Sequence, residues 1–263
     1  MNLRFSRKQL GIPYAVFLIC FVVAPLLVVL YYAFTNGSGQ FTAGNFINFF
    51  TDENTIGTLC YSLVVAATVT VCCTLVAYPV AYILARSNIK KKNVLLVLFI
   101  APMWINFTLR VVALKEVLTM MEGNLAYHPF LNTVIGMTYD FLPFMILPIY
   151  NAVMKIDSHL IEAAYDLGAG KAYMYRKVIL PLCVPGIVSG ITMVFIPALT
   201  TFVISNMLGG GKVNLIGNII EQEFTVNSNW YLGSGLSLVM MVFIIISMVL
   251  LEKFDKTGEG TFI

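Results

Sequence analysis

Six long stretches of apolar residues, separated by short polar segments, dominate the sequence. Each reaches the length of about 20 residues that a helix needs to cross the hydrocarbon core of a membrane, with few or no charges. Their apolar positions are continuous and do not alternate with polar ones, which argues against the strands of a lipid-facing barrel. The pattern predicts six transmembrane helices, at residues 13–33, 61–85, 94–114, 133–154, 182–208 and 231–251.

Lysine and arginine residues gather in alternate loops between these stretches. Positive charge is enriched in cytoplasmic loops, so the alternation predicts an even number of helices with both termini in the cytoplasm. The predicted cytoplasmic side holds Arg4, Arg7, Lys8, Arg86, Lys90, Lys91, Lys92, Lys155, Lys171, Arg176, Lys177, Lys253 and Lys256. The predicted outer side holds Arg110, Lys115 and Lys212, together with the acidic residues Asp52, Glu53, Glu116, Glu122, Glu221 and Glu223.

Composition supports an all-α, polytopic membrane protein embedded in lipid. Of the 263 residues, 59% are hydrophobic and only 11% are charged, and the mean hydropathy is +0.86. A soluble domain has about 25% charged residues. The net charge of +3 is accounted for by the loop residues, so we expect no nucleic-acid partner. We predict a single transmembrane domain over residues 1–263, with a first helix and outer loop at 1–57, core helices at 58–251 and a cytoplasmic loop at 155–181.

The cytoplasmic loop between the fourth and fifth predicted helices contains a short amphipathic helix. Asp157 or Ser158 is a suitable N-cap, because its side chain accepts hydrogen bonds from free backbone N–H groups. Gly168 is suited to end the helix, since glycine tolerates the left-handed conformation found just past a helix terminus. Two uses remain open for such a helix: it rests on lipid at the membrane surface, or it makes contact with a partner protein.

The same loop carries a sequence motif. Glu162-Ala163-Ala164 is followed after three residues by Gly168, and after nine more by Val178, one residue, and Leu180-Pro181. This spacing resembles the EAA loop of the permeases of binding-protein-dependent ABC importers, which usually have isoleucine where this chain has Val178. The resemblance implies the type I ABC importer permease fold, with Glu162 as the charged contact to an ATPase and Gly168 as the bend.

Three further stretches resemble the spermidine/putrescine branch of that family. They are residues 101–110, 142–145 and 208–218. The resemblance implies polyamine import across a bacterial inner membrane, with a homologous second permease, a cytoplasmic ATPase dimer and an extracytoplasmic polyamine-binding protein as partners, in addition to membrane lipid. ATP and Mg²⁺ would be bound by the ATPase, and no cofactor by this chain.

Asp140 is an ionisable residue within the fourth predicted helix. A charge at this depth costs a few kcal/mol unless it is paired or hydrated. It would either line a path for a cationic solute or pair with a polar residue of another helix. Trp104 and Tyr139 are candidates for cation–π contacts along the same path, with a role as interfacial or packing aromatics as the alternative. For Arg110, near the outer end of the third helix, we expect the side chain to reach the lipid headgroups, and the alternative is that it repels or orients a cation.

Catalytic and nucleotide-binding patterns are not found. Gly209-Gly210-Gly211-Lys212 lacks the first glycine and the final Ser or Thr of a phosphate-binding loop. Neither His128 nor His159 has a partner at the spacing of a zinc site. We therefore expect a transport subunit and not an enzyme. A permease for another small solute, and a secondary transporter or channel that needs no ATPase, remain as alternatives.

Overall fold

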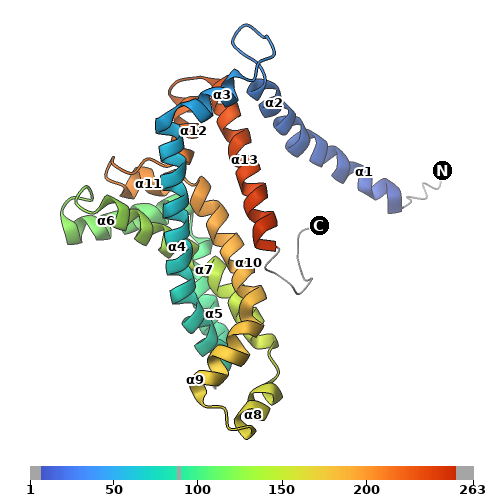
Figure 1. The fold of residues 1–263 in the computed structure, drawn as a ribbon, viewed down its shortest axis with the longest axis vertical. Helices are drawn as coiled ribbons and strands as arrows, with labels where there is room; N and C mark the ends of the chain where they lie inside the picture. Colours follow the sequence, from blue (N-terminus) through green and yellow to red (C-terminus); the bar gives the residue numbers. More distant parts are fainter. Residues whose placement is uncertain (1–6, 88–89, 253–263) are drawn as a thin grey trace. The chain divides into compact units, whose positions relative to one another are not determined.

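The computed structural model describes residues 7–87 and 90–252, and helices occupy most of them (Figure 1). Within this part of the chain no β-strand occurs, and one isolated bridge joins Thr35 to Phe41. The elements in chain order are α1 (Arg7–Leu18), η1 (Ile19–Val23), α2 (Ala24–Ala33), α3 (Gly44–Thr51), α4 (Glu53–Arg86), α5 (Lys92–Ile100), η2 (Ala101–Trp104), α6 (Phe107–Glu122), α7 (Pro129–Lys155), α8 (Ser158–Asp166), α9 (Lys171–Met174), η3 (Tyr175–Ile179), α10 (Leu180–Thr200), α11 (Val203–Leu208), α12 (Ile216–Thr225) and α13 (Trp230–Glu252).

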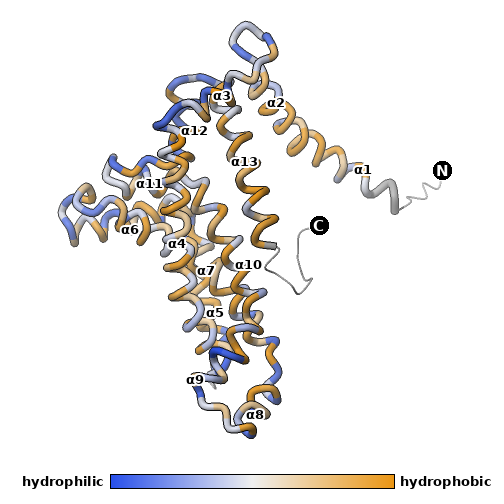
Figure 2. The backbone as a smooth tube through the Cα atoms, in the orientation of Figure 1, coloured by the Kyte–Doolittle hydropathy of each residue, from blue (hydrophilic) through white to orange (hydrophobic). Residues whose placement is uncertain are grey.

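The helical membrane architecture is confirmed. Among the described residues, five helices are long and apolar enough to span a membrane, and a bent pair of helices makes a sixth candidate. Figure 2 shows that apolar residues follow these helices while polar residues gather at the connections. The five are Gly11–Ala33, Glu53–Arg86, Pro129–Lys155, Lys171–Thr200 and Trp230–Leu251.

Two compact units make up the chain, with boundaries after residues 56, 218 and 243. The predicted grouping of residues 1–57 and 58–251 within one domain stays a prediction. The membrane orientation also stays a prediction. Three of the basic residues on which it is based, Arg4, Lys253 and Lys256, lie outside the described residues.

The prediction of one continuous third span was wrong. The helix Lys92–Trp104 ends in a 3₁₀ turn and is followed by α6 at an angle of 97°. Pro102 lies in that turn and has no N–H to continue a helical ladder. Asn106 then caps α6, since its side chain accepts from the backbone N–H of Thr108 at 3.0 Å. Proline and a capping residue within five positions favour a bend over a straight helix.

The fifth span is also shifted relative to its predicted range. It runs continuously from Lys171 to Thr200 and does not reach Leu208, because Thr201 adopts an extended conformation and α11 follows as a separate helix. At its other end, residues 171–181, which were assigned to the predicted cytoplasmic loop at 155–181, belong to the same helix. The wide π turn η3 leads into it, with the Leu180 N–H donating to Tyr175 O.

The larger unit is built around close packing of α7 against α10. A Cβ atom added at Gly186 would lie 2.5 Å from the Ala152 Cβ and 2.6 Å from the Pro148 carbonyl oxygen. One turn further, a Cβ atom at Gly190 would lie 2.5 Å from the Met145 sulfur. Small residues at such spacing allow membrane helices to approach closely. The two helices therefore form a tight frame on which the connecting loop between them is mounted.

In the smaller unit, a polar side chain of α3 contacts the end of α2. The Asn45 side-chain amide donates to Ala33 O at 2.9 Å and to Thr35 O at 3.0 Å. These bonds satisfy carbonyl groups that the end of a helix leaves without partners. In the same unit, the Tyr32 ring lies 5.4 Å from that of Tyr231 in an edge contact. The first span within this unit exposes its apolar residues, as expected of a lipid-facing helix.

Candidate functional site

The segment that joins α7 to α9, residues 156–170, is called the elbow below. Its start is fixed by two contacts. The Arg86 guanidinium at the end of α4 donates to the Ile156 carbonyl oxygen at 2.7 Å, and Ile156 itself is buried. Asp157 then caps α8, since its carboxylate accepts from the His159 backbone N–H at 3.0 Å. The elbow thus leaves the bundle from an anchored residue, with its first helical turn capped.

The end of α8 is closed by a Schellman motif. The Gly168 N–H donates to Tyr165 O at 2.9 Å, and the Ala169 N–H donates to Ala164 O at 3.0 Å. This pair of bonds requires a residue in the left-handed conformation at its centre, and Gly168 has a φ of +80°. The space around Gly168 is open, so its backbone conformation, and not crowding, selects glycine there.

Most side chains of α8 are exposed, and only Ile161 and Ala164 are half-buried. No residue of α8 is buried, although Leu160, Ala163 and Ala164 are apolar. Leu160 is 52% exposed, and Leu167 just past the helix is 90% exposed. Glu162 is exposed and lies 3.5 Å from the His159 Nδ1 atom. Figure 1 shows α8 at one end of the bundle formed by α4, α7 and α10. A capped helix with open apolar and acidic positions has the form of a contact surface.

Of the six predicted coupling residues, four lie on the elbow and two follow it. Glu162, Ala163 and Ala164 lie on α8, and Gly168 ends it. Leu180 and Pro181 are the first residues of α10, beyond the π turn η3. The motif thus extends from the exposed helix into the span that packs against α7.

Asp140 is paired with Arg110 inside the larger unit. The Arg110 Nη1 atom lies 2.9 Å from Asp140 Oδ1, and the two side chains are only 8% and 1% exposed. The expectation that Arg110 reaches the lipid headgroups was therefore wrong. Because α6 bends away from the axis of its predicted span, it brings Arg110 against α7. The buried carboxylate gives the guanidinium a charge-assisted contact inside the fold.

The other candidates for a solute path lie elsewhere on the surface. Trp104, at the end of η2, is 78% exposed, and Tyr139 is 44% exposed although it precedes the buried Asp140. Neighbouring residues of a helix point about 100° apart, which explains that difference. The structure places these three residues in different surroundings, and their role in a solute path stays a prediction.

Residues 77–257 match the family described as "Binding-protein-dependent transport system inner membrane component". The match covers α7, the elbow and α10. The chain belongs to this family. The permease is accordingly a multi-pass membrane protein that serves as a transport subunit and not as an enzyme.

Curated relatives of the permease carry one recurrent description. The permease is 33% identical to the "Spermidine/putrescine transport system permease protein PotB" of Haemophilus influenzae, over 97% of this chain and 96% of the relative. It is 35% identical to the protein of the same description from Escherichia coli, over 70% of this chain and 72% of the relative.

Solved structures share the fold. A bacterial ABC transporter for the import of alginate matches with a TM-score of 0.72 and 13% identity, over 96% of this chain and 95% of that chain. The MetNI methionine ABC transporter in an inward-facing conformation matches with a TM-score of 0.56 and 20% identity, over 76% and 92%. At these identities the likeness concerns the fold alone, and it confirms the ABC permease architecture.

Sequence reasoning missed one feature of the elbow and one polar network elsewhere in the larger unit. Arg86 was assigned only to membrane topology, whereas it anchors the elbow through Ile156. A polar network centred on Asn218 was not expected at all: its Oδ1 accepts from Ser205 Oγ and from the Leu215 N–H, both at 2.8 Å. The signal available for it was the polar pair Ser205 and Asn206 within an otherwise apolar run.

Proposed function

We propose that the permease moves polyamines, spermidine or putrescine, into a bacterial cell as one membrane subunit of an ABC importer. Its partners would be a homologous second permease, an extracytoplasmic polyamine-binding protein and a cytoplasmic ATPase dimer that binds ATP and Mg²⁺. The recurrent description of the curated relatives supports this solute class. The basic loops support an orientation with both termini in the cytoplasm.

The exposed, doubly capped α8 is the observation that carries the proposal. A helix whose ends are closed by its own side chains and backbone transmits a push as a rigid body, because its geometry does not depend on the partner. It continues through the anchored Ile156 into α7 and through η3 into α10. Closure of an ATPase dimer around α8 would therefore reorient these two packed spans, a rigid-body switch between inward-facing and outward-facing states.

Charge reversal on α8 tests this function. We expect Glu162→Lys to reduce copurification of the ATPase with the tagged permease and to lower ATP-dependent spermidine uptake, because the directed acidic contact becomes repulsive. Glu116→Lys on α6 makes the same chemical change at another exposed position and serves as the matched control. We expect it to leave the association unchanged.

Two results would contradict the proposal. ATP-independent uptake by the permease alone would favour a secondary transporter or channel. Uptake of a different solute, with no response to spermidine or putrescine, would retain the ABC permease and reject the polyamine. Competition assays with unlabelled polyamines in proteoliposomes of the assembled transporter separate these outcomes.

A further inference from the structure

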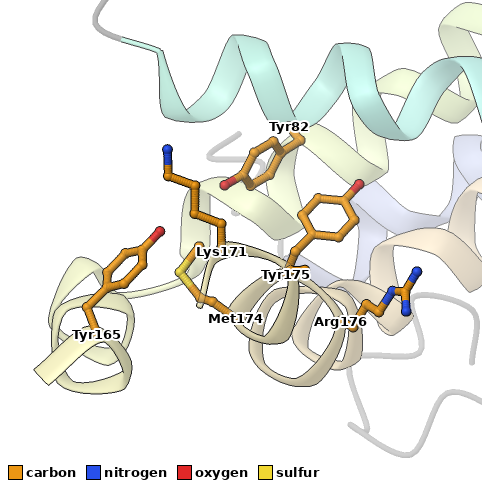
Figure 3. Close-up of a pocket in the computed structure, with 7 residues that line it drawn as sticks. Tyr82, Tyr165, Lys171, Met174, Tyr175 and Arg176 are labelled. Carbon is orange, nitrogen blue, oxygen red and sulfur yellow. The ribbon is translucent and has the colours of Figure 1, made fainter. Parts of the chain in front are cut away.

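A cavity of about 640 Å³ lies beside the elbow within the larger unit (Figure 3). Its wall comes from three helices: α4, α8 and the continuous helix that begins with α9 and η3. Tyr82 comes from α4, Tyr165 from the last turn of α8, and Lys171 from the first position of α9. Convergence of polar side chains from three elements on one hollow is the usual form of a binding site.

Aromatic packing fixes the inner wall of this cavity. The Tyr175 ring makes edge contacts with the rings of Tyr78 and Tyr82, each at a centroid distance of 5.4 Å. Met174, which also lines the cavity, is 5% exposed. The wide π turn that begins at Tyr175 directs this ring between its two partners, and such turns are frequent at functional sites. The wall is therefore formed before any ligand arrives.

The charged lining of the cavity is entirely basic. Lys171 and Arg176 contribute positive charge, and the lining residues include no carboxylate. In Figure 3 the Lys171 amino group and the hydroxyl groups of Tyr82 and Tyr165 are turned toward the same space, whereas Arg176 extends to the other side. An ammonium group and two phenol hydroxyls are hydrogen-bond donors suited to the oxygen atoms of an anion.

Apolar surface continues from the cavity along both membrane-spanning helices. On α4, Leu75 and Val71 are 70% and 57% exposed, at seven and eleven residues before Tyr82 and thus on the same face. On α10, Leu180 and Val184 are 37% and 39% exposed just beyond Arg176. A ligand that combines an anionic group in the cavity with hydrocarbon chains along these faces satisfies both features.

We propose that this cavity binds the phosphate headgroup of an anionic phospholipid. Lys171 supplies the charge, Tyr82 and Tyr165 donate to the phosphate oxygens, and the acyl chains lie along α4 and α10. Basic pockets between membrane helices recognise anionic headgroups in this way. Because Tyr165 belongs to α8, the bound lipid would connect the elbow to the membrane surface. The inference does not depend on which solute the permease transports.

Native mass spectrometry of the assembled transporter in a neutral detergent tests the site. The probe is phosphatidylglycerol, compared with phosphatidylcholine of the same acyl chains. We expect wild-type protein to retain phosphatidylglycerol preferentially, and Lys171→Gln to weaken its binding about fivefold. Tyr82→Phe, which keeps the ring and removes one donor, should cause a smaller loss. Lys177→Gln removes an equally exposed charge one residue beyond the lining residue Arg176 and should leave binding unchanged.

Three results would overturn the proposal. Equal losses of phosphatidylglycerol binding in the Lys171 and Lys177 variants would show that the basic surface attracts the lipid diffusely and has no specific site. Displacement of the lipid by millimolar inorganic phosphate would assign the cavity to a soluble anion. Phosphatidylcholine has the same phosphate beside a cationic choline, so its equal retention would show that the site does not select a headgroup with net negative charge. Thermal midpoints of all variants should match that of the wild type, since both lysines are exposed and their replacement leaves the packing intact.

Discussion

The elbow and the pair formed by Arg110 and Asp140 are held in opposite ways. Beyond its anchor, where Arg86 contacts the buried Ile156, the elbow is built from hydrogen bonds between residues close in sequence, and most of its side chains are exposed. The pair joins α6, which follows the bend, to α7, and both charges are buried. The elbow can therefore change its contacts at little cost to the fold, whereas the pair ties the bent span to α7.

This difference predicts which substitutions alter transport and which alter the stability of the fold. An exposed charge on α8 is solvated whether or not a partner is present, so its replacement should alter coupling and not folding. A buried charge has no such alternative when its partner is removed. The two regions can thus be distinguished by comparing thermal stability with transport in matched variants.

The largest effect is expected at the buried pair. Arg110→Met leaves the Asp140 carboxylate without its partner, and we expect a loss of about 3–5 kcal/mol in stability. The double variant Arg110→Met with Asp140→Leu removes both charges and should recover most of that loss. Thermal unfolding of the detergent-purified permease, followed by intrinsic fluorescence, measures both variants.

The same double variant determines the role of Asp140. If the carboxylate serves only to hold α6 against α7, spermidine uptake should recover together with stability. A stable double variant that no longer transports spermidine would instead place Asp140 in the solute path. Equal stability of the single and double variants would contradict the assigned ion pair.

The features that could be predicted from the sequence are those set by neighbours in the chain. Asp157 and Gly168 were identified as the ends of α8 because capping depends on a few adjacent residues. The break around Pro102 and Asn106 carried a local signal too, but the apolar run across it was interpreted as a single span. Arg110 could not be placed, because its position depends on that bend and on a residue of another helix. The cavity beside the elbow likewise requires three elements to meet.

A smaller effect is expected at the close contact between α7 and α10. Gly186→Ala places a methyl group 2.5 Å from the Ala152 Cβ, so one helix must shift. We expect this shift to lower the free energy of unfolding by about 1–3 kcal/mol. Gly57→Ala on α4 is the matched control, because its added methyl group meets no atom within 4 Å. We expect the control to keep or slightly raise the thermal midpoint. Equal destabilisation by both changes would argue against the tight contact.

The smallest effect on stability, and the clearest on coupling, is expected at Gly168. Alanine there must adopt a φ of +80°, at a local cost of about 1–2 kcal/mol. Gly170 is the matched control, since its φ of −70° suits alanine and its surroundings are open. We expect Gly168→Ala to shift the equilibrium between the capped and the frayed elbow about fivefold or more toward the frayed form, and to lower spermidine uptake. Gly170→Ala should transport normally, and both variants should unfold at the wild-type temperature because the strain is confined to an exposed turn. A lower midpoint for Gly168→Ala would mean that the elbow supports the bundle and is not a separate lever.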